Sequence, residues 1–145
     1  MKLSTKSRYG TRILIDLARH GKNGPVQIGE VSKRQGVSIK YLEQVIRPLK
    51  EAGLVESQRG PKGGHTLAVD PRKISLGKVV RLLETHSHIV DCITEPESCS
   101  ISEDCRVRKA WQSAVDAFYK ELDSVTVASL AKGKGPEPGE EGSCI

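Results

Sequence analysis

The sequence has few aromatic residues and no long apolar run. The 145-residue chain contains no apolar stretch approaching the ~20 residues of a membrane helix, and its N-terminal MKLSTKSRYG has no apolar signal core. We therefore expect a cytoplasmic protein with no membrane partner. Aromatic residues make up only 3% of the chain and hydrophobic residues 37%. Because such a composition supplies a modest core, we expect a second subunit to complete the burial of apolar surface.

The patterns typical of enzymes are also missing. The chain contains no recognisable nucleophile and base pair, no phosphate-binding loop and no paired carboxylates. The glycine-rich run RGPKGG, residues 59–64, lacks the lysine-serine ending and the following helix that a phosphate-binding loop needs. The sequence therefore predicts that the protein is not an enzyme.

Charge is distributed unevenly along the chain. Residues 1–81 hold 17 Lys and Arg against 6 Asp and Glu, whereas residues 82–145 hold 6 against 12. A basic block of this size indicates a polyanionic partner, and the acidic second half indicates a different role.

The spacing of apolar residues in the basic block predicts a mainly α fold, a winged helix-turn-helix with a small β-hairpin wing. Gly36 supplies the tight turn between the second and third helices, and Ser38 caps the third. The expected helices run from Ser4 or Thr5 to about His20, over about 27–35, over the run SIKYLEQVIRPLKEAGL that Ser38 caps, and over about 76–84. The expected strands span Leu54–Gln58 and His65–Val69.

The third helix has the composition of a DNA-reading helix. Ile39, Leu42, Ile46 and Leu49 are expected to face inward. On the outer face, Gln44 can pair with adenine, Glu43 can accept from the cytosine amino group, and Tyr41 can reach a phosphate or a thymine methyl. The wing suits the minor groove of double-stranded DNA. The predicted DNA-contacting residues are Ser38, Lys40, Tyr41, Glu43, Gln44, Arg59 and Gly60.

Three cysteines follow in the acidic half. Cys92 and Cys99 have six residues between them, and Cys99 and Cys105 have five. Structural zinc usually requires two closely spaced pairs, so this spacing favours an iron-sulfur cluster. Thiol-disulfide switching, zinc and inert loop cysteines remain alternatives.

The last predicted element is a helix from about Glu103 to Ser124. Trp111, Val115, Phe118 and Leu122 share one side of it and form the expected dimer interface. The alternative is that this helix packs on its own domain. We therefore expect a DNA-binding domain over 1–84, a cysteine cluster-binding loop over 85–105, a dimerisation region over 106–131 and a disordered tail over 132–145.

From MKLSTKSRYG through YLEQ and RGPKGG to the three cysteines and the start of the long helix, the sequence resembles the IscR-type iron-sulfur regulators, whose relatives include NsrR and CymR. The resemblance implies a homodimeric transcription regulator that binds promoter operators. It implies that Tyr41, Glu43 and Gln44 read the major groove, that Arg59 and Gly60 enter the minor groove, and that the three cysteines hold a 2Fe-2S cluster.

One position departs from that pattern. IscR-like proteins commonly place a histidine three residues after the last cysteine as the fourth ligand, and this chain has Arg108 there. Arginine does not lose its proton to bind iron, so the fourth ligand is open. NsrR-like relatives recruit an acidic residue near the N-terminus of the other subunit, but Arg8 stands at that position. The main candidates are His86 and His88; the others are Asp91, Glu103, Asp104, Cys144 and a small external thiol.

The predicted function is a DNA-binding regulator that senses iron-sulfur cluster status or redox state and controls genes of cluster biogenesis. The alternative is a winged-helix repressor without a cluster, controlled by thiol oxidation or by a partner protein.

Overall fold

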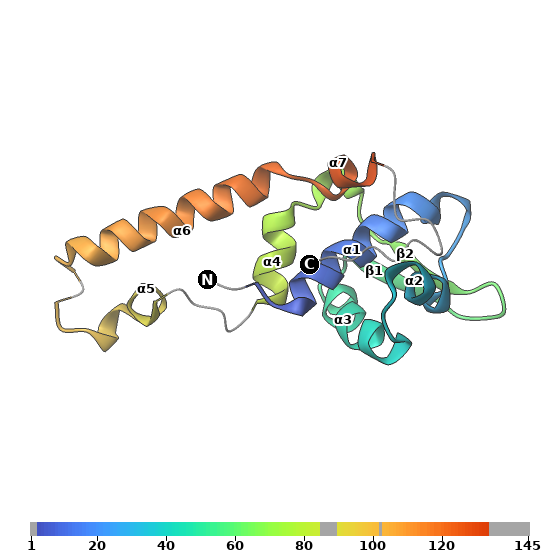
Figure 1. The fold of residues 1–145 in the computed structure, drawn as a ribbon, viewed down its shortest axis with the longest axis horizontal. Helices are drawn as coiled ribbons and strands as arrows, with labels where there is room; N and C mark the ends of the chain where they lie inside the picture. The colour runs from blue at the N-terminus through green and yellow to red at the C-terminus, as the bar shows by residue number, and fades with distance from the viewer. Residues whose placement is uncertain (1–2, 85–89, 102, 134–145) are drawn as a thin grey trace.

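The computed structural model describes residues 3–84, 90–101 and 103–133, and it confirms the mainly α winged-helix fold with a two-stranded hairpin. The order of its regular elements is α1 Thr5–His20, α2 Ile28–Gln35, α3 Ile39–Glu51, β1 Val55–Gln58, β2 Gly64–Leu67, α4 Leu76–Leu83, α5 Asp91–Thr94, α6 Arg106–Ser124 and α7 Val127–Ala131. Single 3-10 turns occupy Gly21–Asn23, Pro71–Lys73 and Pro96–Ser98. Figure 1 shows a head made of α1–α4, α7 and the hairpin, with α6 extending away from it.

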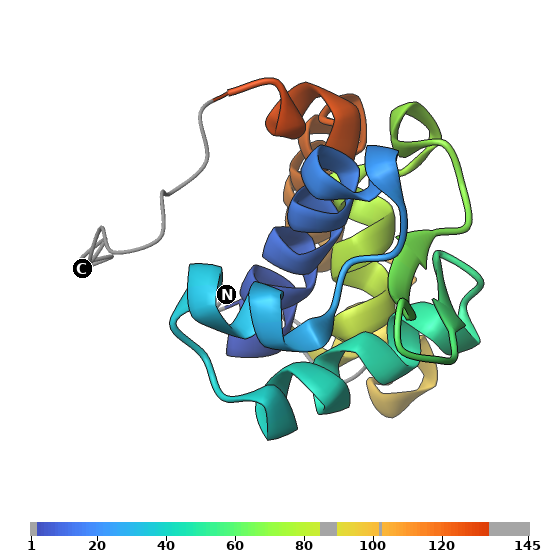
Figure 2. The ribbon, with the colours of Figure 1, turned by 90° about the vertical axis from the view of Figure 1, so that its right-hand side faces the viewer.

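The head is built around α1, which contacts α2, α3, α4 and α7 (Figure 2). Its apolar residues at helical spacing are buried, because neighbouring helices cover that face from several sides. The fully buried side chains of the core come from all of these helices and from the segments between them: Ile13, Leu14, Leu17, Val31, Leu42, Val45, Leu49, Leu54, Ile74, Val79, Val80 and Val127.

The turn between α2 and α3 follows the predicted chemistry. Gly36 ends α2 in the left-handed conformation with φ of 64°, which most side chains disfavour, and its N–H donates to the carbonyl of Ser32. The Ser38 hydroxyl then accepts a hydrogen bond from the backbone N–H of Tyr41 and caps α3.

The predicted inward face of α3 was wrong at one position. Ile39 is 45% exposed, whereas Leu42, Ile46 and Leu49 are buried together with Val45, which the sequence interpretation omitted. Ile39 is the first residue of α3, so its side chain lies at the end of the helix and is not covered by the core. Helical spacing correctly identified the apolar side of α3, but it could not indicate at which residue the core stops covering that side.

The wing is an antiparallel hairpin in which Val55 pairs with Leu67 and Gln58 with Gly64. Its second strand also pairs with Val26, the residue two positions before α2, through an isolated bridge to His65. A Cβ at Gly64 would lie only 2.5 Å from the carbonyl oxygen of Val26. The absence of a side chain at Gly64 therefore lets the wing approach the helix-turn-helix at backbone distance.

The chain returns to the head after α6. Val127, the first residue of α7, is fully buried, and its N–H donates to the carbonyl of Ile74. The Arg19 guanidinium, near the end of α1, donates to the carbonyls of Leu130 and Ala131. No helix was predicted over Val127–Ala131, because five residues are too few to hold a full apolar repeat.

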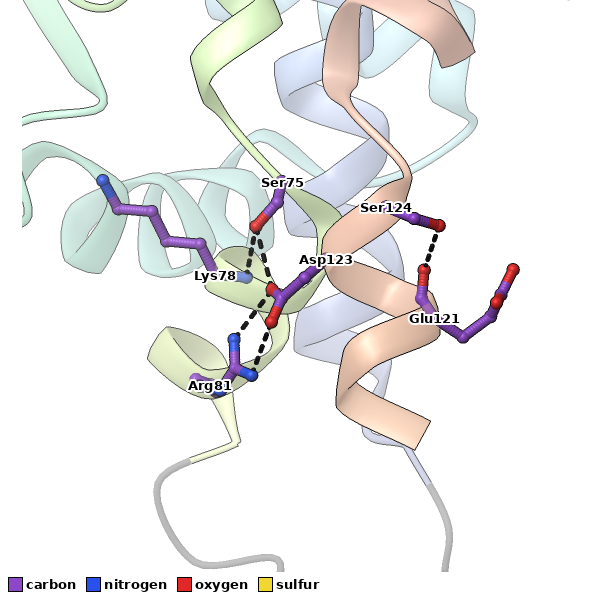
Figure 3. A network of polar contacts seen from close by, with 6 residues as sticks. All are labelled: Ser75, Lys78, Arg81, Glu121, Asp123 and Ser124. Carbon is purple, nitrogen blue, oxygen red and sulfur yellow. Dashed lines mark hydrogen bonds and ion pairs between the residues drawn. The ribbon is translucent and has the colours of Figure 1, made fainter. Parts of the chain in front are cut away.

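Helix α6 begins at Arg106, three residues later than predicted, and Cys105 is its N-cap. Its C-terminal end is attached to α4, where the two terminal guanidinium nitrogens of Arg81 donate to the two carboxylate oxygens of Asp123 at 2.9 and 2.8 Å (Figure 3). The Ser75 hydroxyl donates to the same carboxylate. Arg81 also lies 4.3 Å from the ring centre of Tyr119. None of the 19 residues of α6 is buried in the single chain.

The segment before α6 contains regular structure that the sequence did not predict. Residues Asp91–Thr94 form one helical turn, and Pro96–Ser98 form a 3-10 turn. Both turns are closed by local backbone hydrogen bonds, so a period of apolar residues was not needed to form them.

Candidate DNA-binding surface and cysteine segment

The outer face of α3 presents the predicted polar side chains to solvent. Lys40, Glu43 and Gln44 are exposed, and Arg47 is exposed while paired with Glu51 one turn later at 3.0 Å. These side chains are free to meet the base edges of a major groove, which is wide enough to admit a helix.

Tyr41 is the exception on this face, because its ring is half-buried. It meets the ring of Tyr9 on α1 edge to face, with the ring centres 5.7 Å apart and the planes at 81°. Burial and the neighbouring Tyr9 raise the pKa of the Tyr41 hydroxyl above its ordinary value, at which the group already carries its proton at neutral pH. The sequence interpretation placed Tyr41 on the outer face but did not predict its partner.

The wing tip exposes Arg59 and Gly60, the residues predicted to enter the minor groove, together with Lys62. At the base of the wing, His65 lies beside α3 and shares with Glu43 and Lys50 a cavity of about 360 Å³. Burial and the positive charge of Lys50 lower the pKa of His65, and Glu43 partly opposes this. The His65 ring nitrogen Nδ1 lies 3.0 Å from the Ser57 hydroxyl across the hairpin. The wing and α3 therefore form one continuous surface.

A buried ion pair that the sequence interpretation missed joins α1 to α2. The Arg34 guanidinium donates to both carboxylate oxygens of Asp16, at 2.9 and 2.6 Å, and the Gln35 amide donates to the same carboxylate at 3.2 Å. The side chains of Arg34 and Asp16 are 16% and 3% exposed. The hydrogen bond to Asp16 raises the pKa of Arg34. The available signal was an acidic residue among the buried positions Ile13, Leu14 and Leu17 of α1.

The three predicted cysteine ligands are half-buried thiols that form no disulfide. Cys92 lies on α5, Cys99 follows the 3-10 turn, and Cys105 caps α6, where its sulfur accepts from the backbone N–H of Arg108 at 3.4 Å. Within the described part of the chain, no group of three or more His, Cys, Asp and Glu side chains is gathered as a metal site requires. The structure thus does not bring the three thiols together. His86, His88 and Cys144 lie outside the described residues.

Arg108 holds the cysteine segment to α6. Its guanidinium nitrogen Nε donates to the backbone carbonyl of Cys92 at 2.9 Å. Three cysteine sulfurs match the donors that iron-sulfur clusters take, so the donor set fits such a group as three of its four ligands. Arg108 is a cation with donors only and does not supply the fourth.

A groove runs between α1 and α4 on the side where α6 leaves the head. This α1–α4 groove has a volume of about 510 Å³. Its apolar wall is Leu3, Leu76, Val80 and Leu122, and its cations are Arg8 and Arg12 on α1. Near its edge, the Glu84 carboxylate accepts from the backbone N–H of Ser4 and from the hydroxyl of Ser7, which holds the start of α1 against the end of α4.

The exposed face of Trp111 and Val107 lies further along α6. Trp111 is 46% exposed and Val107 63% exposed, and Val115, Phe118 and Leu122 are half-buried. Large apolar side chains at this exposure are typical of an unfilled interface.

No helix within the described ranges is long and apolar enough to cross a membrane.

A helix-turn-helix with an exposed polar third helix and an adjoining hairpin wing defines the class of winged-helix transcription regulators. Within that class, the family model Rrf2, described as an iron-dependent transcriptional regulator, matches residues 3–133. The chain therefore belongs to the Rrf2 family, whose members are DNA-binding transcription regulators and not enzymes. This confirms the resemblance and the prediction that the chain is not an enzyme.

Named relatives span nearly the whole chain. The protein is 43% identical over 132 residues to Protein rrf2 of Nitratidesulfovibrio vulgaris, covering 91% of this chain and 88% of the relative. Among solved structures, it is similar to CymR, the global cysteine regulator of B. subtilis, with a TM-score of 0.72, 35% identity and coverage of 90% and 96% of the two chains. It is also similar to T. potens IscR, with a TM-score of 0.71, 37% identity and coverage of 91% and 87%.

Proposed function

We propose that this regulator binds operator DNA as a homodimer in the cytoplasm, and that an iron-sulfur cluster held by Cys92, Cys99 and Cys105 controls its operator binding. The observation that carries the proposal is the position of the three thiols on the segment that ends at the N-cap of α6. The targets that fit such a sensor, by similarity to IscR, are genes of iron-sulfur cluster biogenesis.

DNA reading is assigned to α3 and the wing. Gln44 and Glu43 meet base edges in the major groove, Tyr41 and Lys40 contact phosphate, and the Arg59-Gly60 tip enters the minor groove. Ser38 acts by capping the helix and by placing its first turn near the DNA backbone. The excess of Lys and Arg over residues 1–81 supplies the non-specific part of the affinity.

Dimerisation is assigned to α6. Its apolar side is exposed at Val107 and Trp111 and only half-covered at Phe118, and the α1–α4 groove offers an apolar wall of comparable character. A twofold dimer in which each α6 packs against the other copy buries both surfaces. The alternative, in which α6 packs on its own head, is supported only for the end of the helix near Asp123.

Cys105 would link cluster binding to α6, because it is both a proposed cluster ligand and the N-cap of that helix. Its sulfur caps the first turn of the helix by accepting from Arg108, and a metal-bound thiolate would carry more negative charge at that helix N-terminus. A bound two-iron cluster would supply one-electron redox chemistry and sensitivity to oxygen and iron supply. Cluster occupancy would act by ordering the loop from Cys92 to Cys105, which leads into α6. A coupling of ~1–3 kcal/mol is enough for a regulatory response of roughly 5- to 150-fold.

The fourth ligand is the open part of this proposal. Arg108 is excluded by its charge, and its bond to the Cys92 carbonyl gives it a positioning role. His86 and His88, which follow α4 in the sequence, remain the first candidates, and a small external thiol is another.

A second candidate function is a cluster-free regulator controlled by thiol oxidation or by a partner protein. Two observations favour it: the thiols are not gathered in the described structure, and CymR, a cysteine regulator, is among the similar structures.

Anaerobic purification decides between the two. The cluster proposal expects a coloured protein with visible absorption and about two irons per chain, as a two-iron cluster requires. Replacing Cys92, Cys99 and Cys105 by Ser should abolish both, whereas the control Ser100→Ala, at an exposed position of the same segment, should keep both. A colourless wild-type protein whose DNA binding responds to reversible thiol oxidation would favour the second candidate.

A further inference from the structure

Tyr9 lies at the junction of two surfaces that the proposed function treats separately. Its ring meets Tyr41 of α3 edge to face, at 5.7 Å between ring centres. Tyr9 also contacts two cations: the guanidinium carbons of Arg8 and Arg12 lie 5.0 and 5.4 Å from its ring centre. Both arginines line the α1–α4 groove. Tyr9 therefore touches the DNA-reading helix and is held by the side chains of the groove.

We propose that Tyr9 is a positioning residue for DNA binding: it fixes the ring of Tyr41 so that the Tyr41 hydroxyl donates to a DNA phosphate. The inference rests on the proposed function and deepens it.

The packing explains why Tyr41 needs such support. It lies in the first turn of α3, half-buried at the edge of the core, and Ile39, two residues before it, is exposed. Tyr9 is the aromatic partner recorded for its ring, and the Arg8 guanidinium also donates to the Tyr9 hydroxyl at 3.4 Å. A ring held in one orientation before binding avoids the entropy cost of ordering it on the DNA.

A double-mutant cycle tests the proposal. The probe is a duplex selected from a random-sequence pool by the wild-type protein, and binding is measured with the protein in its dimeric concentration range. Tyr9→Leu removes the ring but keeps an apolar side chain, and should weaken binding about 3- to 10-fold, the size typical of an aromatic pair. Tyr9→Phe keeps the ring contacts and is the matched control; it should stay within about twofold of the wild type.

The second arm repeats Tyr9→Leu in a Tyr41→Phe background, which lacks the hydroxyl but keeps the buried ring. There the additional loss should be less than about twofold, because Tyr9 then has no hydroxyl to position. An equal loss in both backgrounds, or no loss in either, would overturn the proposal. A purely structural role for Tyr9 would give the same loss in both.

If Tyr9→Leu does not fold, the cycle is run with Arg8→Met plus Arg12→Met, which leaves the Tyr9 ring in place. If the arginines only contact phosphate, their loss weakens binding by the same factor with Tyr41 or Phe at position 41. A smaller loss in the Tyr41→Phe background therefore supports the positioning role of Tyr9, and an equal loss in both backgrounds refutes it. A wild-type protein that selects no duplex would remove the proposed DNA reading itself, which distinguishes the two failures.

Discussion

Replacing Arg34 by methionine should destabilise the protein strongly, because it leaves a carboxylate buried without its cation. The Asp16 side chain is 3% exposed, and among the described residues the donor that would remain is the Gln35 amide at 3.2 Å. Removing one partner of a buried ion pair typically costs ~3–5 kcal/mol. Since Arg34 itself is 16% exposed, we expect a loss at the lower end, about 3 kcal/mol.

The assay is equilibrium unfolding in urea followed by circular dichroism. With a urea slope of ~1–3 kcal/mol per molar, a loss of this size lowers the midpoint by roughly 1 to 3 M. The matched control is Arg72→Met. Arg72 contacts Asp70 at the same 2.6 Å as the Arg34 pair, but the Arg72 side chain is 81% exposed. The control midpoint should stay close to that of the wild type, because solvent screens an exposed pair.

A rescue variant separates charge burial from lost packing. Asp16→Asn in the Arg34→Met background removes the buried charge and should recover most of the lost stability. The reasoning is refuted if Arg34→Met and Arg72→Met shift the midpoint equally, or if the Asp16→Asn rescue makes the protein less stable. Because the pair joins α1 to α2, Arg34→Met should also weaken operator binding at temperatures where the protein remains folded.

Three further changes test other parts of the structure. Gly64→Ala places a Cβ against the backbone of Val26 and should cost about 1 to 3 kcal/mol, whereas Gly21→Ala meets no atom within 4 Å; equal melting temperatures would contradict this. Burial lowers the pKa of His65, so the unfolded chain takes up this proton first as the pH falls, and stability is full above pH ~6.5 and declines below it. Urea midpoints between about pH 7.5 and pH 5.5 should therefore fall more for the wild type than for His65→Gln, and parallel curves would exclude the effect. Trp111→Glu should convert dimers to monomers in sedimentation velocity, and an unchanged dimer would remove α6 from the interface.

The sequence determined the local part of this protein well. Helical spacing, the caps Ser38 and Ser75 and the turn at Gly36 act over a few residues, so the helix-turn-helix and the wing were predictable with small errors in their bounds. The exposed residues of α3 and the wing tip were predictable for the same reason. The three cysteines were found from spacing, and their role in binding iron stays a prediction.

Only the tertiary structure decided which distant residues meet. Asp16 and Arg34 are 18 positions apart and Tyr9 and Tyr41 are 32 apart, and neither pair leaves a periodic signal in the sequence. The return of α7 onto α1, the exposure of Ile39 and the bond from Arg108 to Cys92 likewise follow from how whole helices pack. The physical reason is range: capping and hydrophobic periodicity depend on neighbours within one or two turns, whereas pairing across the core depends on the placement of every helix at once.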